Sequence, residues 1–448
     1  MMARNKESNL GRVRKLVGDE RKFLWNPLSN IILVARIKGN VSEKKLRNAI
    51  NKTKEIHPLL ASRVVYDQDN EAYFHTDNVP EIPFRVVEWK SDNQWQEELM
   101  YENRIPFKLF EGPLIRFVLI KSQQVSDFMV YCQHSISDGR GLVYLIRDIL
   151  LNTTLPDREV KQLPIPPTLS SEGLYPYVPK KDSLKKSLTK SVKKFMINRM
   201  NKNWRKDITT FDQEDFENIH KVYWQKNEYR IELMELSEDQ TTNLVTKCRE
   251  HDVTVNSALT VAFLAAHYHI SGPFKGKKRI VALPIDLRKR MNVSDVFCLY
   301  ISRVLLKFDY KVKHSFWQNV KRFHDTATNE IKSANLFEPL LTIEQMDSTL
   351  IDAIASFGIL AEIVPPEFTR YGKLSTFASK KKNEAIKLAH RFLKLSPGTV
   401  MTNLGKPDVP NVYGEMQIEK MYFAPSTDER FPLVIGALTA GGKLVVNP

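Results

Sequence analysis

A proline-rich segment, residues 155–179, separates two long stretches of this chain that both carry strand and helix patterns. Proline fixes a backbone dihedral and lacks an amide donor, so this density of proline argues against regular structure. The prolines are Pro156, Pro164, Pro166, Pro167, Pro176 and Pro179. The 448 residues also exceed what one hydrophobic core usually serves. We therefore expect two lobes, residues 1–154 and 207–448, joined by a connecting region, 155–206.

Short runs with period-two alternation predict strands in both stretches, and apolar residues three or four apart predict helices. In the first stretch we expect strands at 31–37, 62–67, 72–75, 84–88, 114–120 and 126–133, and helices beginning at 42, around 93–103 and after 139. In the second we expect strands within 222–235 and at 280–284, 304–308, 400–404, 415–423 and 433–438, and helices at 238–251, 254–267, 315–332, 340–360 and 380–393. The mixture predicts an α/β (α+β) fold whose halves share a similar order of elements.

The second part of the connecting region, residues 180–206, is strongly basic. It holds eleven Lys or Arg and one acidic residue, a net charge of +10 out of +15 for the whole chain. Apolar residues recur at helical spacing: Leu184, Leu188, Val192, Phe195 or Met196, Met200 and Trp204. A basic amphipathic helix suits a membrane surface or a protein partner. A helix packed on the body of the protein with solvated lysines fits equally well, whereas nucleic acid binding is disfavoured because the charge is local and no recognised module accompanies it.

The overall composition is that of a globular protein, with 42% hydrophobic and 27% charged residues. Cys132, Cys248 and Cys298 have neither a zinc-binding nor a disulfide spacing, which indicates a reducing compartment. His267 and His269 lie two apart on an expected helix, hence on different faces, so we predict no metal site there. No apolar run approaches the ~20 residues of a membrane span, and the N-terminus is too polar for a secretion signal. We expect a cytoplasmic monomer, with contact at a membrane surface through 180–206 as the open possibility.

Residues 129–142, MVYCQHSISDGRGL, bring chemically useful groups together. The expected strand ends at His134, turn-forming residues follow, and a helix begins after Gly139. A strand, a tight turn and a helix start present an imidazole at the edge of a sheet, where it can accept a proton near neutral pH. Asp138 could orient the ring or brace the turn, and Gly139 allows a backbone conformation that a side chain forbids. An ordinary strand–turn–helix junction whose histidine packs or caps is the alternative.

The segment HSISDG, residues 134–139, resembles the HxxxDG signature of the acyltransferase superfamily that contains chloramphenicol acetyltransferase, nonribosomal peptide condensation domains and alcohol acetyltransferases. Other segments resemble the family in the right order: LVGDERKFL at 16–24, IHPLLASRV at 56–64, the helix at 254–266, LPIDLR at 283–288 and TNLG at 402–405. The resemblance spans nearly the whole chain. It implies two chloramphenicol acetyltransferase-like lobes, each a mixed β-sheet with flanking helices, and an active-site tunnel between them.

The resemblance also implies residue roles. His134 would be the general base that removes a proton from a hydroxyl or amine acceptor while it attacks an acyl thioester, with direct transfer and no acyl-enzyme. Asp138 would point away from the substrate and pair with Arg288. Thr402 and Asn403 are candidate donors to the developing oxyanion, of which we favour Asn403, and Gly139 and Gly405 would allow close backbone approach.

A coenzyme A thioester is the expected co-substrate, and no bound cofactor is implied. The lysines of GPFKGKK, Lys275, Lys277 and Lys278, could meet its phosphates, although this segment lacks the spacing of a phosphate loop. An acyl-carrier protein is the alternative donor. A third possibility, from another class, is a non-catalytic relative that binds a membrane or protein through the basic helix.

Three departures from the family pattern narrow down which branch of the superfamily this chain resembles. Condensation domains usually carry two adjacent histidines, and Gln133 stands in place of the first one here. Peptide-bond formation on carrier proteins is therefore less expected for this chain. Ala61 replaces the arginine of the segment after the first helix, although Arg63 is kept. The DFGWG ending of plant BAHD acyltransferases is missing. The sequence stops at Pro448 where relatives usually add a helix, so that helix is either dispensable or not included.

Overall fold

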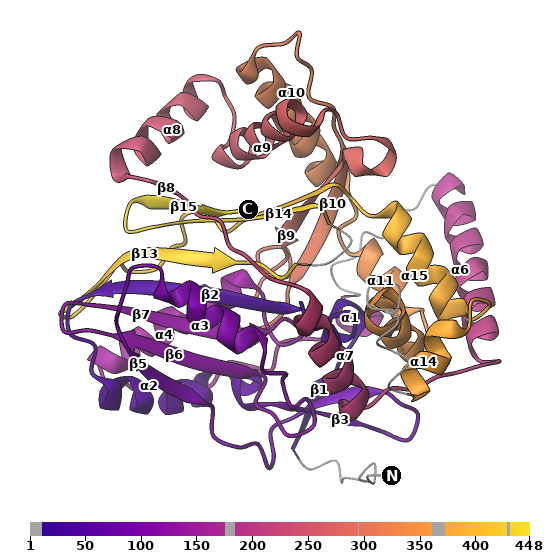
Figure 1. Cartoon of the computed structure of the whole chain (residues 1–448), viewed down its shortest axis with the longest axis horizontal. Helices are drawn as coiled ribbons and strands as arrows, with labels where there is room; N and C mark the ends of the chain where they lie inside the picture. The colour runs from indigo at the N-terminus through magenta and orange to yellow at the C-terminus, as the bar shows by residue number, and fades with distance from the viewer. Residues whose placement is uncertain (1–10, 175–183, 294, 361–371, 428–430) are drawn as a thin grey trace.

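The computed structural model describes residues 11–174, 184–293, 295–360, 372–427 and 431–448. Two six-stranded sheets and one three-stranded sheet form its framework (Figure 1). The first large sheet has the order β12 (Val412–Tyr413), β13 (Met416–Ala424), β2 (Asn30–Lys38), β7 (Val125–Gln133), β6 (Ile115–Lys121), β5 (Phe84–Glu88). The second has the order β10 (Ile301–Lys307), β9 (Ile280–Asp286), β11 (Thr399–Asn403), β14 (Leu433–Ala440), β15 (Lys443–Asn447), β8 (Met234–Leu236). The expected two-lobed α/β fold is confirmed.

Helices cover both large sheets. The first lobe carries α1 (Gly18–Leu24), α2 (Glu43–Ile56), a 3₁₀ turn at Pro58–Ala61, α3 (Gln94–Asn103) and α4 (Gly139–Thr154). Its small sheet has the order β1 (Arg12–Lys15), β4 (Ala72–His75), β3 (Arg63–Tyr66). The rest of the chain adds α5 (Ser171–Leu174), α6 (Leu184–Trp204), α7 (Gln213–Lys226), α8 (Glu238–Glu250), α9 (Val255–Ser271), a 3₁₀ turn at Gly276–Arg279, α10 (Phe316–Ser333), α11 (Glu338–Glu344), α12 (Ser348–Asp352), a π-helical turn at Ala353–Gly358, α14 (Gly372–Ser379) and α15 (Glu384–Leu395). Strands β2, β6 and β7 are buried on both faces, as a sheet between layers requires.

One pair of strands crosses the boundary expected at residue 207. β12 and β13 belong to the second stretch of the sequence, yet β13 pairs antiparallel with β2 over nearly its whole length. In Figure 1 the yellow β13 lies beside the indigo β2 and beneath β15. The buried residues of both lobes form one continuous cluster. The division into residues 1–154 and 207–448 therefore needs correction, because residues 412–424 complete the sheet of the first lobe.

Helix α7 is a second difference from the expected elements. Strand was predicted within 222–235 because Val222, Tyr223 and Trp224 favour strands locally. The structure instead continues a helix to Lys226 and leaves β8 three residues long. Asp212 caps this helix by accepting a hydrogen bond from the backbone of Asp215, and buried side chains recur at Phe216, Ile219, His220 and Tyr223. The helical period over the longer window outweighs the local propensity.

The predicted helix at 340–360 and the proline-rich segment, which was predicted to be irregular, also differ in detail. Asp347 interrupts the former by accepting a hydrogen bond from the Thr349 backbone at a new helix start, which gives α11, α12 and the π-helical turn in its place. Within 155–179, which was expected to be irregular, α5 forms one short turn. Residues 175–179 lie outside the described residues.

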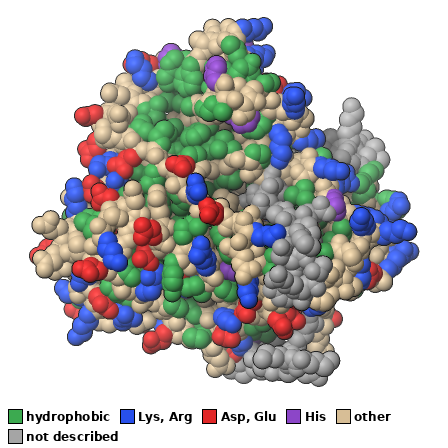
Figure 2. All heavy atoms as spheres, viewed as in Figure 1, with side chains coloured by type: hydrophobic (Ala, Val, Ile, Leu, Met, Phe, Trp, Pro, Cys, Tyr) green, Lys and Arg blue, Asp and Glu red, His purple; other side chains and the backbone are tan. Residues whose placement is uncertain are grey.

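Helix α6 confirms the predicted helix in the basic segment, and its apolar residues divide between exposed and buried positions. Of the described side chains, Ile197 and Trp204 are buried, whereas Val192, Phe195 and Met196 are 58%, 68% and 46% exposed. The Trp204 indole donates a hydrogen bond to the Thr349 hydroxyl at 2.8 Å. Figure 2 shows Lys and Arg side chains gathered on the right flank of the molecule, where α6, α14 and α15 lie in Figure 1. The helix is therefore anchored at its C-terminal end and presents cationic and apolar side chains together to solvent.

Candidate functional site

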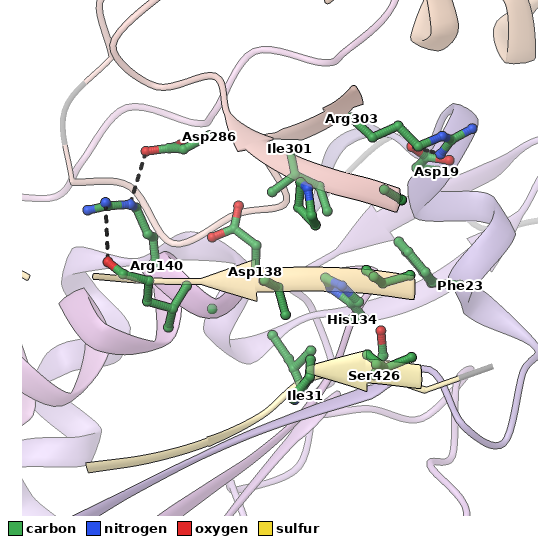
Figure 3. A pocket seen from close by; sticks show the side chains of 18 of the residues that line it. Asp19, Phe23, Ile31, His134, Asp138, Arg140, Asp286, Ile301, Arg303 and Ser426 are labelled. Atoms are coloured by element: carbon green, nitrogen blue, oxygen red, sulfur yellow. Dashed lines mark hydrogen bonds and ion pairs between the residues drawn. The ribbon is translucent and has the colours of Figure 1, made fainter. Parts of the chain in front are cut away.

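A cavity of about 180 Å³ lies between the two large sheets and is lined by His134 (Figure 3). Ile31 on β2 and Phe423 on β13 come from the first sheet. Residues from β9, β10, β11 and β14 supply the wall formed by the second sheet. The cavity therefore lies where the resemblance placed a tunnel between the lobes.

His134 is held in one orientation directly after β7. Its backbone amide donates to the Ser29 carbonyl at 2.9 Å. Its Nδ1 lies 2.7 Å from the Ser137 carbonyl oxygen, and the ring stacks on Phe23 with centroids 4.3 Å apart. A carbonyl oxygen can only accept, so Nδ1 carries the proton of the neutral ring and Nε2 keeps its lone pair. The turn thus fixes the tautomer in which Nε2 is the basic nitrogen.

The surroundings of His134 favour the neutral ring. Burial lowers the pKa of His134 below its ordinary value of 6.5, because a charged imidazolium loses its hydration there. The positive charge of Lys22 lowers this pKa further, while the Ser137 carbonyl and Asp138 act in the opposite direction. A neutral imidazole at pH 7 is the form that can accept a proton.

Asp138 and Arg288 form a buried ion pair that joins the two lobes. Asp138 Oδ2 accepts from Arg288 Nη1 at 2.9 Å and from the Tyr300 backbone amide at 2.8 Å, while Oδ1 caps α4 by accepting from Gly141. Arg288 also donates to the carbonyls of Val296 and Cys298. Both side chains are almost fully buried. Through these contacts the Asp138 carboxylate holds the turn that follows His134 and connects that turn to Arg288 and Tyr300 of the other lobe.

The glycines of the site act differently from what the sequence predicted. Gly139 has no left-handed backbone, but a Cβ there would lie 2.8 Å from the Phe423 ring and 2.9 Å from Leu404. A Cβ on Gly141 would lie 2.2 Å from the Ser137 hydroxyl, and no sequence motif marked this glycine. Gly405 meets nothing within 4 Å but has φ of +68°. Gly139 therefore permits close packing by side chains, and Gly405 permits a left-handed turn.

Thr402 and Asn403 both line the cavity at the end of β11. Asn403 Oδ1 accepts a hydrogen bond from the Gly405 backbone amide at 2.7 Å. This contact fixes the orientation of the side-chain amide, so that Nδ2 is the donor left for another partner. Side chains alternate along a strand, but both residues reach the cavity because β11 ends at Asn403.

Several residues of the cavity wall had no motif to mark them. Phe23 stacks on His134, and Ser426 follows β13 and lies near the ring in Figure 3. Asp19 lies 3.6 Å from Lys22 and 3.7 Å from Arg303. Burial alone would raise the pKa of the Asp19 carboxyl, but these two cations lower it. For Asp19, Lys22 and Phe23, the only sequence signal was the resemblance of residues 16–24 to the segment that precedes the first strand in the family. That resemblance implied no role for these side chains.

Gln133, which replaces the first histidine of the condensation motif, faces the backbone of the preceding segment. Its Nε2 donates to the Phe23 carbonyl at 2.6 Å, and its Oε1 accepts from the Ser135 amide at 2.5 Å. It does not line the cavity. The side chain therefore fastens the segment that carries Phe23 to the turn that carries His134.

The candidate coenzyme A lysines lie apart from this cavity. Lys275, Lys277 and Lys278 lie in or beside the 3₁₀ turn before β9, whereas Asp286, at the other end of that strand, lines the cavity. Ala282 on β9 also lines the cavity and follows Lys278 by four residues, a path of ~13 Å along the chain. Their role in binding phosphates stays a prediction.

Among the residues that the structure describes, no group of three or more His, Cys, Asp or Glu side chains could hold a metal ion. Within that same part of the chain, no helix is both long and apolar enough to cross a membrane.

Comparisons with known proteins agree on one family and fold. The family model for the condensation domain matches residues 27–358. A component of the linear gramicidin synthase of Brevibacillus parabrevis is 20% identical over 337 residues, which are 72% of this chain and 6% of that protein. A component of the plipastatin synthase of Bacillus subtilis is 25% identical over 119 residues, 26% of this chain and 5% of that protein. The chain thus spans only a small part of the length of these relatives.

Solved structures extend the likeness to the whole chain at the level of the fold. The trichothecene 15-O-acetyltransferase TRI3 from Fusarium sporotrichioides has a TM-score of 0.62 at 11% identity, with 99% of this chain and 92% of that chain covered. Polyketide synthase associated protein 5 from Mycobacterium tuberculosis has a TM-score of 0.57 at 14% identity, with 98% and 93% covered.

Proposed function

This chain belongs to the condensation-domain family, and from that premise we propose that it is an acyltransferase. The proposed reaction moves an acyl group from a thioester, with acyl-CoA as donor, to a hydroxyl or amine acceptor in the cavity at His134. The observation that carries the proposal is the buried, neutral imidazole whose Nδ1 is held by the Ser137 carbonyl and whose Nε2 is the basic nitrogen. That arrangement suits a general base.

In the proposed step, Nε2 of His134 takes the proton from the acceptor as its oxygen or nitrogen forms a bond to the thioester carbonyl carbon. The carbonyl oxygen becomes negatively charged in the tetrahedral intermediate. Collapse breaks the carbon–sulfur bond, and the leaving thiolate takes the proton back from the imidazolium. The imidazole is neutral again, and no acyl-enzyme forms.

Asn403 is the proposed donor to that oxyanion. Its Nδ2 is oriented by the Oδ1 contact to Gly405, and the residue lines the cavity with His134. A pre-placed donor of this kind contributes ~3 kcal/mol of transition-state stabilisation in comparable sites. Asp138 and Arg288 are proposed to act only through the position of the turn, since their polar atoms bind each other, the backbone and, for Arg288, the Asp286 carboxylate.

The direct test is release of free thiol from acyl-CoA donors in the presence of a panel of alcohols and amines. Release that requires an acceptor supports the transferase. If CoA donors give no release, the same assay with acyl groups on a carrier protein tests the carrier-dependent alternative, which the family membership also permits. Absence of release with both donors would overturn the proposal and leave a non-catalytic relative, which binds a membrane or protein through α6, as the better account.

The lowered pKa of His134 predicts how activity depends on pH. The neutral base is required, so kcat/KM should stay constant as pH falls through 6.5 and decline only at lower pH. Lys22→Gln removes a positive charge that lowers this pKa, so the decline should move to higher pH in that variant. A pH profile of kcat/KM for the wild type and the variant provides the measurement. A wild-type decline centred above 6.5, or an unchanged profile in the variant, would contradict the assignment.

Contact of α6 with an anionic membrane surface is proposed as an accessory property. Val192, Phe195 and Met196 are exposed among cationic residues, and both features favour an anionic lipid surface. Lys194→Glu combined with Lys202→Glu should weaken co-sedimentation with phosphatidylserine-containing vesicles by tenfold or more, because each basic residue near such a surface contributes ~1 kcal/mol. Phe195→Asp should weaken it as well.

Ile270→Asp is the matched control for Phe195→Asp, because Ile270 is 84% exposed on α9, away from α6. It should leave sedimentation unchanged. Equal sedimentation of the wild type and the α6 variants would exclude this contact and leave the helix as a packing element with solvated lysines.

A further inference from the structure

A second hollow, of about 760 Å³, adjoins the site cavity; we call it the side groove. Lys22, Ala282, Arg303 and Phe431 line both spaces. The rest of the side groove is built mainly from β10, the end of α10, α11, the α12 region and α15. Apolar side chains dominate its wall, among them Leu305, Ile343, Ile351, Ile354, Phe392 and Leu395. The side groove and the site cavity therefore share a wall region.

The β9–β10 ladder connects the two spaces. Three successive pairs on one face are Ile301 with Asp286, Arg303 with Pro284, and Leu305 with Ala282. Ile301 and Asp286 line the site cavity, whereas Leu305 lines only the side groove. Figure 3 shows Ile301 and Arg303 at the cavity. The first and third pairs are four residues apart along the strand, a path of ~13 Å.

The side groove is open to a ligand and poorly suited to an anion. Leu305 is 51% and Leu395 is 41% exposed, so apolar surface is presented to solvent there. The cations at the shared wall are engaged, because Lys22 and Arg303 both lie near Asp19. Lys193 at the rim pairs with Glu338. These features favour an uncharged, extended apolar group that begins at the site cavity.

We propose that the side groove binds the alkyl chain of a long-chain substrate whose reacting carbon or oxygen lies at His134. The placement of the reacting atom at His134 rests on the proposed acyl transfer. Binding of the alkyl chain in the side groove does not depend on that reaction. The same chain chemistry can come from a fatty acyl thioester or from a fatty alcohol. Either source would place a methylene chain along Arg303 and Leu305.

Binding can be measured without turnover in the His134→Ala protein. Calorimetric titration with acetyl-, hexanoyl-, decanoyl- and tetradecanoyl-CoA tests the donor, and hexanol, decanol and tetradecanol test the acceptor. In the series that uses the side groove, affinity should rise about fourfold per buried methylene. Affinity independent of chain length in both series would overturn the proposal, even if the enzyme transfers acetyl groups.

Variants of the side groove locate the chain. Leu305→Lys, at an exposed position, and Ala334→Phe, which fills space in the wall, should each weaken binding of the decyl and tetradecyl ligands at least tenfold and leave acetyl-CoA unchanged. Ile270→Lys places the same charge at an exposed apolar position outside the groove. It should change neither the affinity for the decyl and tetradecyl ligands nor the affinity for acetyl-CoA. Equal weakening of acetyl-CoA would mean that the pantetheine arm occupies the groove, which overturns the proposal. Chain-length-dependent binding without thiol release in the wild type would retain the groove and refute the proposed reaction.

Discussion

Replacing His134 by Gln is expected to lower kcat by two to four orders of magnitude, because general base catalysis typically contributes ~10²–10⁴-fold. Glutamine can keep a polar contact in the turn but cannot accept a proton near neutral pH. Stopped-flow or steady-state thiol release with saturating donor and acceptor measures the effect. Substrate affinity should change much less, since the imidazole acts on the transferred proton.

His220→Gln is the control for this experiment. His220 is also buried, and burial lowers its pKa to about 4, but it lies on α7 and does not line the cavity. Its replacement can lower the melting temperature, yet kcat of the folded protein should remain near the wild-type value. A His134→Gln protein with wild-type kcat would refute the role of the imidazole.

Replacing Arg288 by Met is expected to have the second large effect, on both stability and rate. The change leaves the buried Asp138 carboxylate without its cation and frees the carbonyls of Val296 and Cys298. Removal of one partner of a buried pair typically costs ~3–5 kcal/mol of folding free energy. Because the same carboxylate caps α4 next to His134, kcat should also fall more than tenfold at temperatures where the variant is folded. Chemical denaturation and thiol release measure the two effects.

Arg36→Met separates the loss of rate from the loss of stability. Arg36 makes two hydrogen bonds of 2.9 Å to the buried Asp127 carboxylate, but both residues belong to the first sheet and neither lines the cavity. This variant should lose comparable stability and keep its kcat. Equal kcat in the Arg288 and Arg36 variants would show that the Asp138–Arg288 pair only stabilises the fold. Arg288→Lys should rescue little, because an ammonium group cannot reach the same set of acceptors.

Much of the site could be predicted from the sequence because its polar residues lie in short, local motifs. The strand that ends at His134, the turn and the start of α4 fall within twenty residues, where periodicity and turn chemistry are informative. The pairing of Asp138 with Arg288 was expected only from the resemblance, since 150 residues separate them. The structure contains that ion pair at 2.9 Å.

What could not be predicted depends on contacts between distant segments. Phe23 stacks on His134 because β2, β7 and α1 meet there, and no local pattern records that meeting. Gly139 is required by Phe423 and Leu404, which come from the other end of the chain. Whether the apolar residues of α6 are packed or exposed could not be predicted either, since helical periodicity shows which residues share a face but not which face has a neighbour. In the structure Trp204 is buried and Phe195 is exposed.

The pairing of β13 with β2 also ties the timing of folding to synthesis. Strand β2 leaves the ribosome early, as do the strands from β5 to β7. Strand β13 follows much later, because Met421 of β13 pairs with Ala35 of β2, almost four hundred residues earlier in the chain. Contacts with such long separation are slow to form because the intervening chain must first be ordered. Until then, the β2 edge is unpaired and open to the association that exposed strands invite. The sheet that carries His134 can therefore be completed only after nearly the whole chain has been made.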